Sequence, residues 1–196
     1  MTLWYVARAA GFVALLMLTA SVTLGALAST RTGANTPGGL DRRYLRQMAH
    51  RSFAVAGLLL IAFHATLIVL DSFVDVSLSG ALIPFTSAWR PFAVGLASLA
   101  LYATVATAIS GAARGRLASS AAAARRWRTV HVAAYAGWAL AMGHGILAGT
   151  DTGTIWSTAI YVVCAIAVLM AVATRLRARP TPLPIPARNQ YARSLR

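Results

Sequence analysis

The four histidines of this 196-residue chain are the residues whose spacing points to chemistry. His50 and His64 are 14 residues apart in one apolar stretch, and His131 and His144 are 13 apart in another. On a helix, either spacing corresponds to about 20 Å along the axis. If the two helices run in the same direction, His50 lies level with His131, and His64 lies level with His144. Facing imidazoles can bind the iron of a flat macrocycle from both sides, so the spacing predicts two haem sites, one in each half of a membrane.

The 13-residue step does not follow from an ideal helix. At 100° per residue it turns His144 about 140° away from His131, whereas 14 residues turn His64 only about 40° from His50. Local distortion would let both rings reach one side, and three glycines are available for it: Gly137, Gly143 and Gly145. The alternatives to haem are a proton relay, another metal or simple packing. We favour a functional role because ionisable residues inside a membrane are costly.

The composition places these stretches in a lipid bilayer. Hydrophobic residues make up 58% of the chain and charged residues 11%, against about 25% charged in soluble domains. The cations, all arginine, are bunched between apolar runs instead of covering one solvated face, which argues against a nucleic-acid partner. Five runs are long enough to cross a hydrocarbon core of about 30 Å: residues 4–28, 52–70, 91–111, 130–148 and 155–174.

The helices are expected to extend beyond the apolar runs. The second is predicted to begin near Asp41, after Gly38 and Gly39, and the fourth near Ser119 or Ser120, because these residue types are good N-caps. The fold class predicted is therefore an all-α integral membrane bundle of about five transmembrane helices.

Arginine placement predicts the orientation, because cytoplasmic loops near span ends hold an excess of basic residues. Sixteen of the 18 arginines lie in the first loop, the third loop and the tail, whereas only Arg8 and Arg90 lie on the other side. This predicts a multi-pass protein of the cell membrane with its N-terminus outside and its C-terminus in the cytoplasm. A cleaved signal peptide ending near residues 26–28 is the alternative for the first span.

The remaining sequence suggests no second domain. Residues 1–178 are interpreted as the membrane haem domain. Residues 179–196 are rich in proline and arginine, so we expect a cytoplasmic tail that is disordered. Cys164 has no partner for an intrachain disulfide. No glycine-rich nucleotide motif occurs, which predicts no flavin or nicotinamide site and therefore electrons from a partner, either a separate flavoprotein or a quinol.

Guanidinium groups are candidates for binding haem propionates, since charge-assisted bonds are strong. Arg51 and Arg128, with Arg126 nearby, are expected beside the His50–His131 pair, which is the inner one in this orientation. Arg90 is expected beside the outer His64–His144 pair, and Arg8 is a weaker candidate there.

Two further residues fall between the predicted haem levels. Trp138 is six residues before His144, where it either packs or shortens an electron path, and packing is favoured. Gly57 is midway between His50 and His64, where it serves helix packing or leaves room between macrocycles.

The histidine pattern is similar to that of the ferric reductase-like transmembrane domain, which is shared by ferric reductases, NADPH oxidases and the haem membrane subunit of bacterial methionine sulfoxide repair. The two histidine spacings and the segments 125–131 and 144–151 carry the resemblance over roughly residues 1–178. It implies an iron-binding, two-haem b-type cytochrome for electron transport, with His50/His131 and His64/His144 as axial ligands. Such a chain would be an oxidoreductase component without its own flavin or NADPH domain, delivering electrons to an acceptor at the outer face. The alternative is a non-redox transporter or scaffold.

Overall fold

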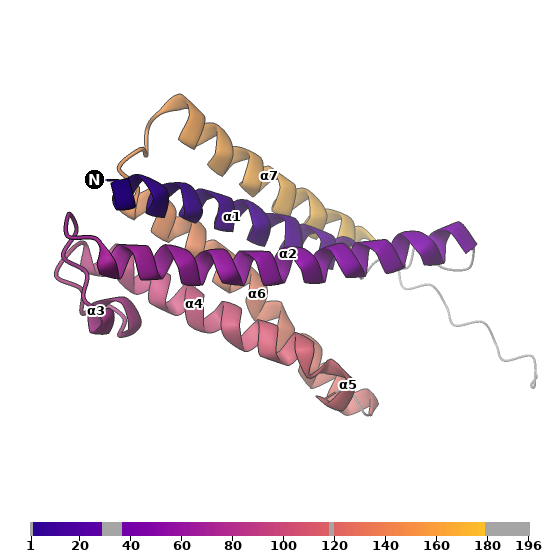
Figure 1. The fold of residues 1–196 in the computed structure, drawn as a ribbon. Helices are drawn as coiled ribbons and strands as arrows, with labels where there is room; N and C mark the ends of the chain where they lie inside the picture. The colour runs from indigo at the N-terminus through magenta and orange to yellow at the C-terminus, as the bar shows by residue number, and fades with distance from the viewer. Residues whose placement is uncertain (1, 29–36, 118–119, 179–196) are drawn as a thin grey trace, which may run out of the picture.

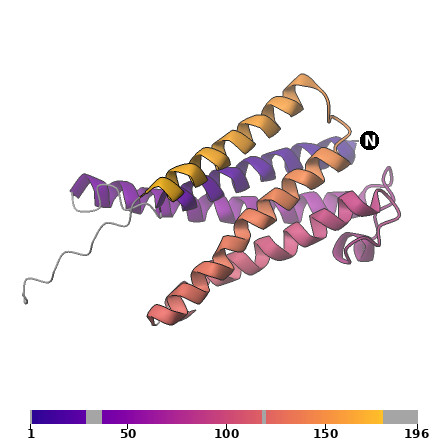
Figure 2. The same ribbon diagram turned by 180° about the vertical axis from the view of Figure 1, so that it is seen from behind.

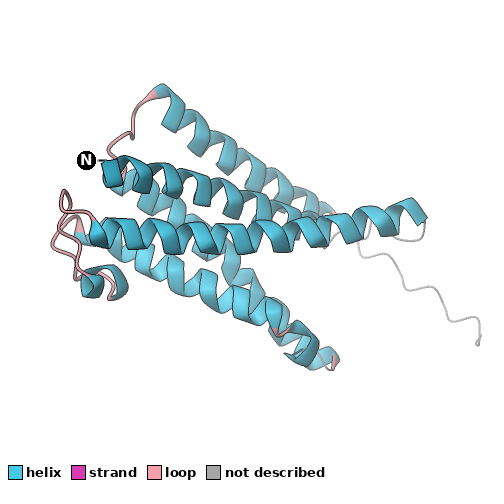
Figure 3. Ribbon diagram, viewed as in Figure 1, coloured by secondary structure: helices cyan, strands magenta, loops and turns pink. Residues whose placement is uncertain are grey.

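The computed structural model describes residues 2–28, 37–117 and 120–178, and these form seven helices and no β-strand. Five of the helices are long and apolar enough to cross a membrane, which confirms the predicted all-helical, five-span bundle (Figures 1 and 3). They are α1 (Thr2–Ala28), α2 (Pro37–Leu70), α4 (Pro91–Ala112), α6 (Ala121–Ala148) and α7 (Ile155–Arg177). Two short helices, α3 (Leu78–Leu82) and α5 (Arg114–Leu117), lie between them. The predicted tail, residues 179–196, falls outside the described residues.

The helix starts test two expectations from the sequence. The start of α2 is at Pro37, so the prediction that it begins near Asp41 was wrong. Proline suits the first turn because the N–H it lacks has no intrahelical partner there. The N-cap of α6 is Ser120, whose hydroxyl accepts a hydrogen bond of 3.1 Å from the Ala123 N–H. This confirms one of the two predicted caps, and Ser119 lies outside the described residues.

The bundle is built from two antiparallel helix pairs. Helix α1 packs closely along α2, α4 packs closely along α6, and α7 lies against α1. The two views in Figures 1 and 2 show these helices spread between two ends. We call the end with the start of α1, α3 and residues 149–154 the α3 end. We call the other end, with α5 and the starts of α2 and α6, the arginine-rich end.

One glycine in each pair allows the helices to approach closely. A Cβ atom on Gly57 of α2 would lie 3.2 Å from Leu18 Cδ2 of α1. A Cβ atom on Gly137 of α6 would lie 3.1 Å from Thr104 Oγ1 and 3.2 Å from Ala103 Cβ of α4. Small residues at such crossings are typical of helices packed in a membrane. Gly57 therefore serves helix packing, the first of its two interpretations.

Candidate functional site

The four histidine rings meet as two couples between α2 and α6. The ring centres of His50 and His131 are 6.2 Å apart, and those of His64 and His144 are 6.3 Å apart. The two rings of each couple are inclined at 73°. The structure therefore brings together the histidines that the sequence placed at equal heights. His131 and His144, which are 13 residues apart, each meet their expected partner on α2.

Three of the rings are held by backbone carbonyls of the neighbouring helix. The Nδ1 atom of His64 lies 2.7 Å from the Ala7 carbonyl oxygen, and that of His50 lies 2.8 Å from the Ser21 carbonyl oxygen. In the other helix pair, His144 Nδ1 lies 2.9 Å from the carbonyl oxygen of Ala93. A carbonyl oxygen can only accept, so each Nδ1 carries the proton and donates it.

The fourth ring is held through a hydroxyl. Ser110 donates from Oγ to the Thr107 carbonyl at 2.7 Å, so its oxygen is left to accept from His131 Nδ1 at 3.4 Å. This contact is longer than the three carbonyl bonds. All four imidazoles thus have a protonated Nδ1, and the unprotonated Nε2 of each is available as a metal ligand.

The tethers reveal an internal repeat. The carbonyls of Ala7 and Ser21 come from residues 14 apart on α1, and Ala93 and Thr107 are also 14 apart on α4. In each pair, the two residues of one helix that hold the histidines of the other helix are therefore separated by the same number of residues. Two similar hairpins, α1 with α2 and α4 with α6, each contribute one histidine to each couple.

The 13-residue step departs from this repeat at one place only. His64 and His144 each follow the central glycine of their helix by seven residues, whereas on the other side His50 precedes Gly57 by seven and His131 precedes Gly137 by six. The missing residue thus lies between His131 and Gly137. His131 is also the histidine with the longest Nδ1 contact, at 3.4 Å from Ser110 Oγ. The difference in helical phase therefore affects this histidine.

Glycines on the neighbouring helices leave room for three of the rings. A Cβ atom on Gly11 would lie 3.1 Å from His64 Cε1, and one on Gly25 would lie 3.1 Å from His50 Cε1. The corresponding distance from Gly111 to His131 is 3.4 Å. Each of these glycines follows a tethering residue by four positions, one helical turn, so carbonyl and glycine form a single seat for the ring.

A cavity surrounds the His64–His144 couple and extends to the α3 end. Its walls are mainly apolar, and they include both imidazoles, Trp89, Arg8 and Asp151. Arg8 forms an ion pair with Asp151, which joins α1 to the loop after α6. A mostly apolar cavity with a few convergent polar groups is the usual form of a small-molecule or cofactor site.

The predicted propionate-binding arginines differ in their surroundings. Arg51 and Arg128 are exposed and donate no hydrogen bond to another described residue. At the α3 end, Arg90 caps α4 in a left-handed conformation, stacks over Trp89 and donates to the Leu147 carbonyl at 2.6 Å. Its contact with the loop end of α6 places it near the cavity, with one guanidinium nitrogen bonded to that carbonyl.

Two tryptophans have well-defined contacts near the couples. Trp138 donates from Nε1 to Thr19 Oγ1 at 2.9 Å and packs against a buried cluster of α1, α6 and α7. The packing role favoured for Trp138 is therefore the observed one. Trp127 stacks on His131, with ring centres 4.9 Å apart and planes inclined at 21°. Sequence reasoning missed this contact, although the four-residue spacing of Trp127 and His131 on one helix was a signal for it.

Comparisons with protein-family models, with curated proteins and with solved structures find no match to this chain.

Proposed function

We propose that this chain is a two-haem b-type membrane cytochrome of the ferric reductase-like kind, which moves electrons across the cell membrane. The four histidines are its axial ligands, with His50 and His131 in the inner site and His64 and His144 in the outer site. The resemblance in histidine spacing motivates the family assignment. The observation that carries the proposal is the distance between the rings of each couple.

The ring distances fit a shared iron. An imidazole nitrogen binds a first-row metal ion at about 2.0 Å and lies about 1.2 Å from its own ring centre, so two rings that share one ion have centres about 6.4 Å apart. The observed values of 6.2 and 6.3 Å agree with this distance. Two imidazoles with the other positions filled by a porphyrin match the donor set that is present.

The protein's part is to hold each ligand in one orientation. The carbonyls of Ala7, Ser21 and Ala93 fix the tautomer of the three imidazoles that donate to them, and such outer contacts also raise ligand basicity. A bound haem would supply reversible one-electron chemistry at its iron. If histidines held the haem from both sides, no position would remain for a substrate, and the site would be suited to passing electrons without binding one.

The arginine distribution supports the direction of transfer. Eleven described arginines lie toward the arginine-rich end, whereas Arg8 and Arg90 lie at the α3 end. The excess of basic residues favours the arginine-rich end as cytoplasmic, with the N-terminus outside. Electrons would then come from a cytoplasmic donor and leave toward an acceptor beyond the α3 end, where the cavity around the outer couple reaches.

The proposal is tested by the haem content of the purified full-length chain. We expect a low-spin b-type absorption spectrum and two haems per chain. His64→Ala and His144→Ala should each remove the same haem, recognised by its midpoint potential, and His50→Ala and His131→Ala should each remove the other. A folded but colourless protein would refute the proposal. Loss of different haems in His64→Ala and His144→Ala would refute the pairing.

A further inference from the structure

Three planar groups form a stack from the His50–His131 couple toward the arginine-rich end. Trp127 lies on the His131 ring, and the Arg114 guanidinium carbon lies 5.0 Å from the centre of the Trp127 ring. The indole N–H donates to the Ser110 carbonyl at 2.8 Å, which fixes the orientation of the ring. Guanidinium groups favour the face of an aromatic ring, so Arg114 also helps to fix the indole.

The stack occurs at only one of the four histidines. Among the described residues, no other aromatic side chain stacks on His50, His64 or His144, whose ring contacts are with the partner histidines. Trp127 is also partly exposed, so it connects the couple with the surface at that end. An aromatic ring in van der Waals contact with a ligand shortens the gap that an electron must cross from a donor outside.

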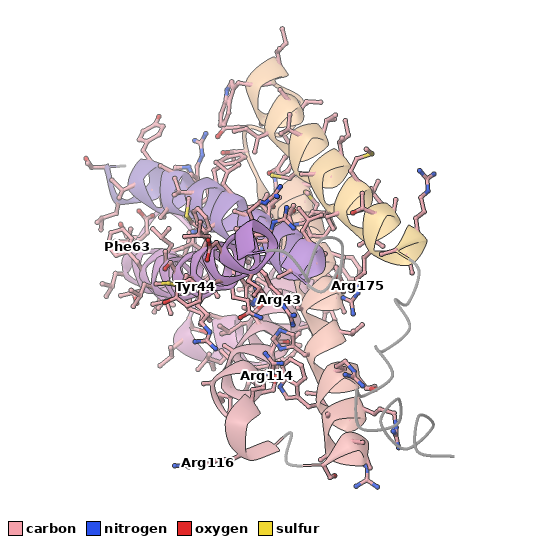
Figure 4. All side chains as sticks on the ribbon, turned by 90° about the vertical axis from the view of Figure 1, so that its right-hand side faces the viewer. Arg43, Tyr44, Phe63, Arg114, Arg116 and Arg175 are labelled. Atoms are coloured by element: carbon pink, nitrogen blue, oxygen red, sulfur yellow. The ribbon has the colours of Figure 1, made fainter. Side chains whose placement is uncertain are left out.

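The charge around the stack favours an acidic partner. Arg114 of α5 lies over the Trp127 ring that stacks on His131, and Arg175 of α7 is a second cation close to this couple. Arg175 donates to the hydroxyl of Tyr135 at 3.0 Å, and Tyr135 lies one helical turn from His131. Figure 4, viewed from the arginine-rich end, shows Arg116 pointing away from the bundle. A field of one sign steers a partner of opposite charge and sets its orientation.

We propose that an acidic electron-carrying protein docks at the arginine-rich end over Arg114, and that its electrons reach the His50–His131 couple through Trp127. This inference rests on the proposed function. In each transfer, the reduced donor protein would lose one electron, and an iron held by the couple would gain it and pass from ferric to ferrous. No bond is made or broken in this chain, and Trp127 acts as a positioned conductor.

The docking step is tested by binding, without any turnover. The full-length chain is placed in nanodiscs of uncharged lipid, and its affinity for oxidised flavodoxin, an acidic FMN protein, is measured at low and physiological ionic strength. We expect binding that weakens with salt, because screening shortens the reach of surface charge. Arg114→Gln should weaken binding about three- to tenfold, since it removes a charge at the docking centre.

Arg177→Gln is the matched control. It removes the same charge from the same end, but Arg177 is exposed and has no contact with the stack. Its effect should be clearly smaller than that of Arg114→Gln. Absence of binding, or equal effects of the two variants, would overturn the docking proposal. Loss of flavodoxin binding when anionic lipid is added to the discs would assign these arginines to lipid headgroups and would also overturn it.

The conducting role is tested by the rate of haem reduction. Trp127→Leu should slow reduction by reduced flavodoxin about tenfold, as do changes in groups that touch metal ligands. Trp127→Phe should retain most of the rate, because a ring still covers His131. Reduction by duroquinol, an uncharged small hydroquinone, should be equal in all three proteins.

The outcomes separate the two proposals. A wild-type chain without haem refutes the proposed function before any variant is made. Normal haem content with a wild-type rate in Trp127→Leu overturns the conducting role alone. If Trp127→Leu changes the spectrum or loses the inner haem, then Trp127 only positions His131, and this too overturns the inference.

Discussion

At the scale of single residues, the candidate sites depend on atoms outside the imidazoles. Each ring rests on a neighbouring helix through its Nδ1, and three rings rest against a glycine of that helix. The seat of each of these rings therefore needs an acceptor for the Nδ1 proton and a glycine, which leaves space for the ring. The acceptor is backbone at three of the four positions, so it survives most side-chain replacements. The glycine is the part that a mutation can remove.

Valine at a seat glycine should displace one ring selectively. Gly11→Val places two methyl groups against His64 and Gly25→Val places them against His50, where even a Cβ would be tight. We expect the first variant to lose the outer haem and the second to lose the inner one. Haem-to-protein ratios with redox titration measure this.

The matched control for these variants is Gly115→Val, since a Cβ there meets nothing within 4 Å. Valine is a better helix former than glycine, so lost haem could not come from helix propensity. Gly111→Val should have a milder effect on His131, in keeping with its longer distance of 3.4 Å. Equal haem loss from Gly11→Val and Gly115→Val would contradict the role of Gly11 in leaving space for His64.

The Arg8–Asp151 ion pair gives a prediction about stability. The side chains are 21% and 19% exposed, so neither charge is well solvated. Asp151→Asn should lower the free energy of unfolding by about 2 kcal/mol, between the values for exposed and buried pairs. Thermal unfolding can be followed with a thiol-reactive dye, because Cys164 is buried until the bundle opens.

Asp75→Asn is the comparison for this variant, since Asp75 is exposed at the same end and pairs with no described residue. The double variant Arg8→Gln with Asp151→Asn should be less destabilised than the sum of the single changes, because no charge is left unpaired. Additive effects would mean that the pair contributes nothing.

At the scale of helices, the sequence predicted the spans well and the angular placement of the side chains poorly. The apolar runs and Ser120 are local signals, and hydrophobic length alone defines a membrane span. The phase of His131 is not local. An ideal helix turns it away from His144, and only its tether through Ser110 and its stack with Trp127 show how the ring is held toward His50.

The arginines show the same difference between local signals, which the sequence carries, and side-chain contacts, which it does not. Their positions in sequence predicted which end they occupy, but Arg51 and Arg128 were predicted beside a haem on height alone. That placement stays a prediction, and the structure adds Arg114 over Trp127, which stacks on His131, and Arg175 bonded to Tyr135. Both of these arginines belong to other helices, α5 and α7, so no spacing within the histidine helices could identify them.

The crossing of α4 and α6 leads to a prediction at this scale. Gly137→Val should force the helices apart at Ala103 and Thr104 and lower stability by about 1–3 kcal/mol, the usual cost of overpacking. Haem loss should affect both sites, because the crossing lies between them. Gly143→Val is the control, since its Cβ would meet only the flexible end of Leu96 at 3.4 Å. Loss of one haem only would argue against a common crossing.

At the scale of the whole molecule, the two ends differ in charge and therefore in the side of the membrane they are expected to face. In a Cys164→Ala background, single cysteines introduced as Ser72→Cys at the α3 end and Gly115→Cys at the arginine-rich end report the orientation. Both positions are exposed. A membrane-impermeant maleimide should label the first in intact cells, and the second only after lysis. The reverse pattern would contradict the proposed direction of electron flow.

The duplicated hairpins have a consequence for assembly. Each ring couple takes one histidine from α1–α2 and one from α4–α6, so neither half of the chain contains a complete binding site. On the proposed function, an iron porphyrin is then a bridge between two half-molecules. Severing the backbone between the hairpins should yield fragments that associate more tightly when porphyrin is supplied, in addition to the contacts of α1 with α6 and α7.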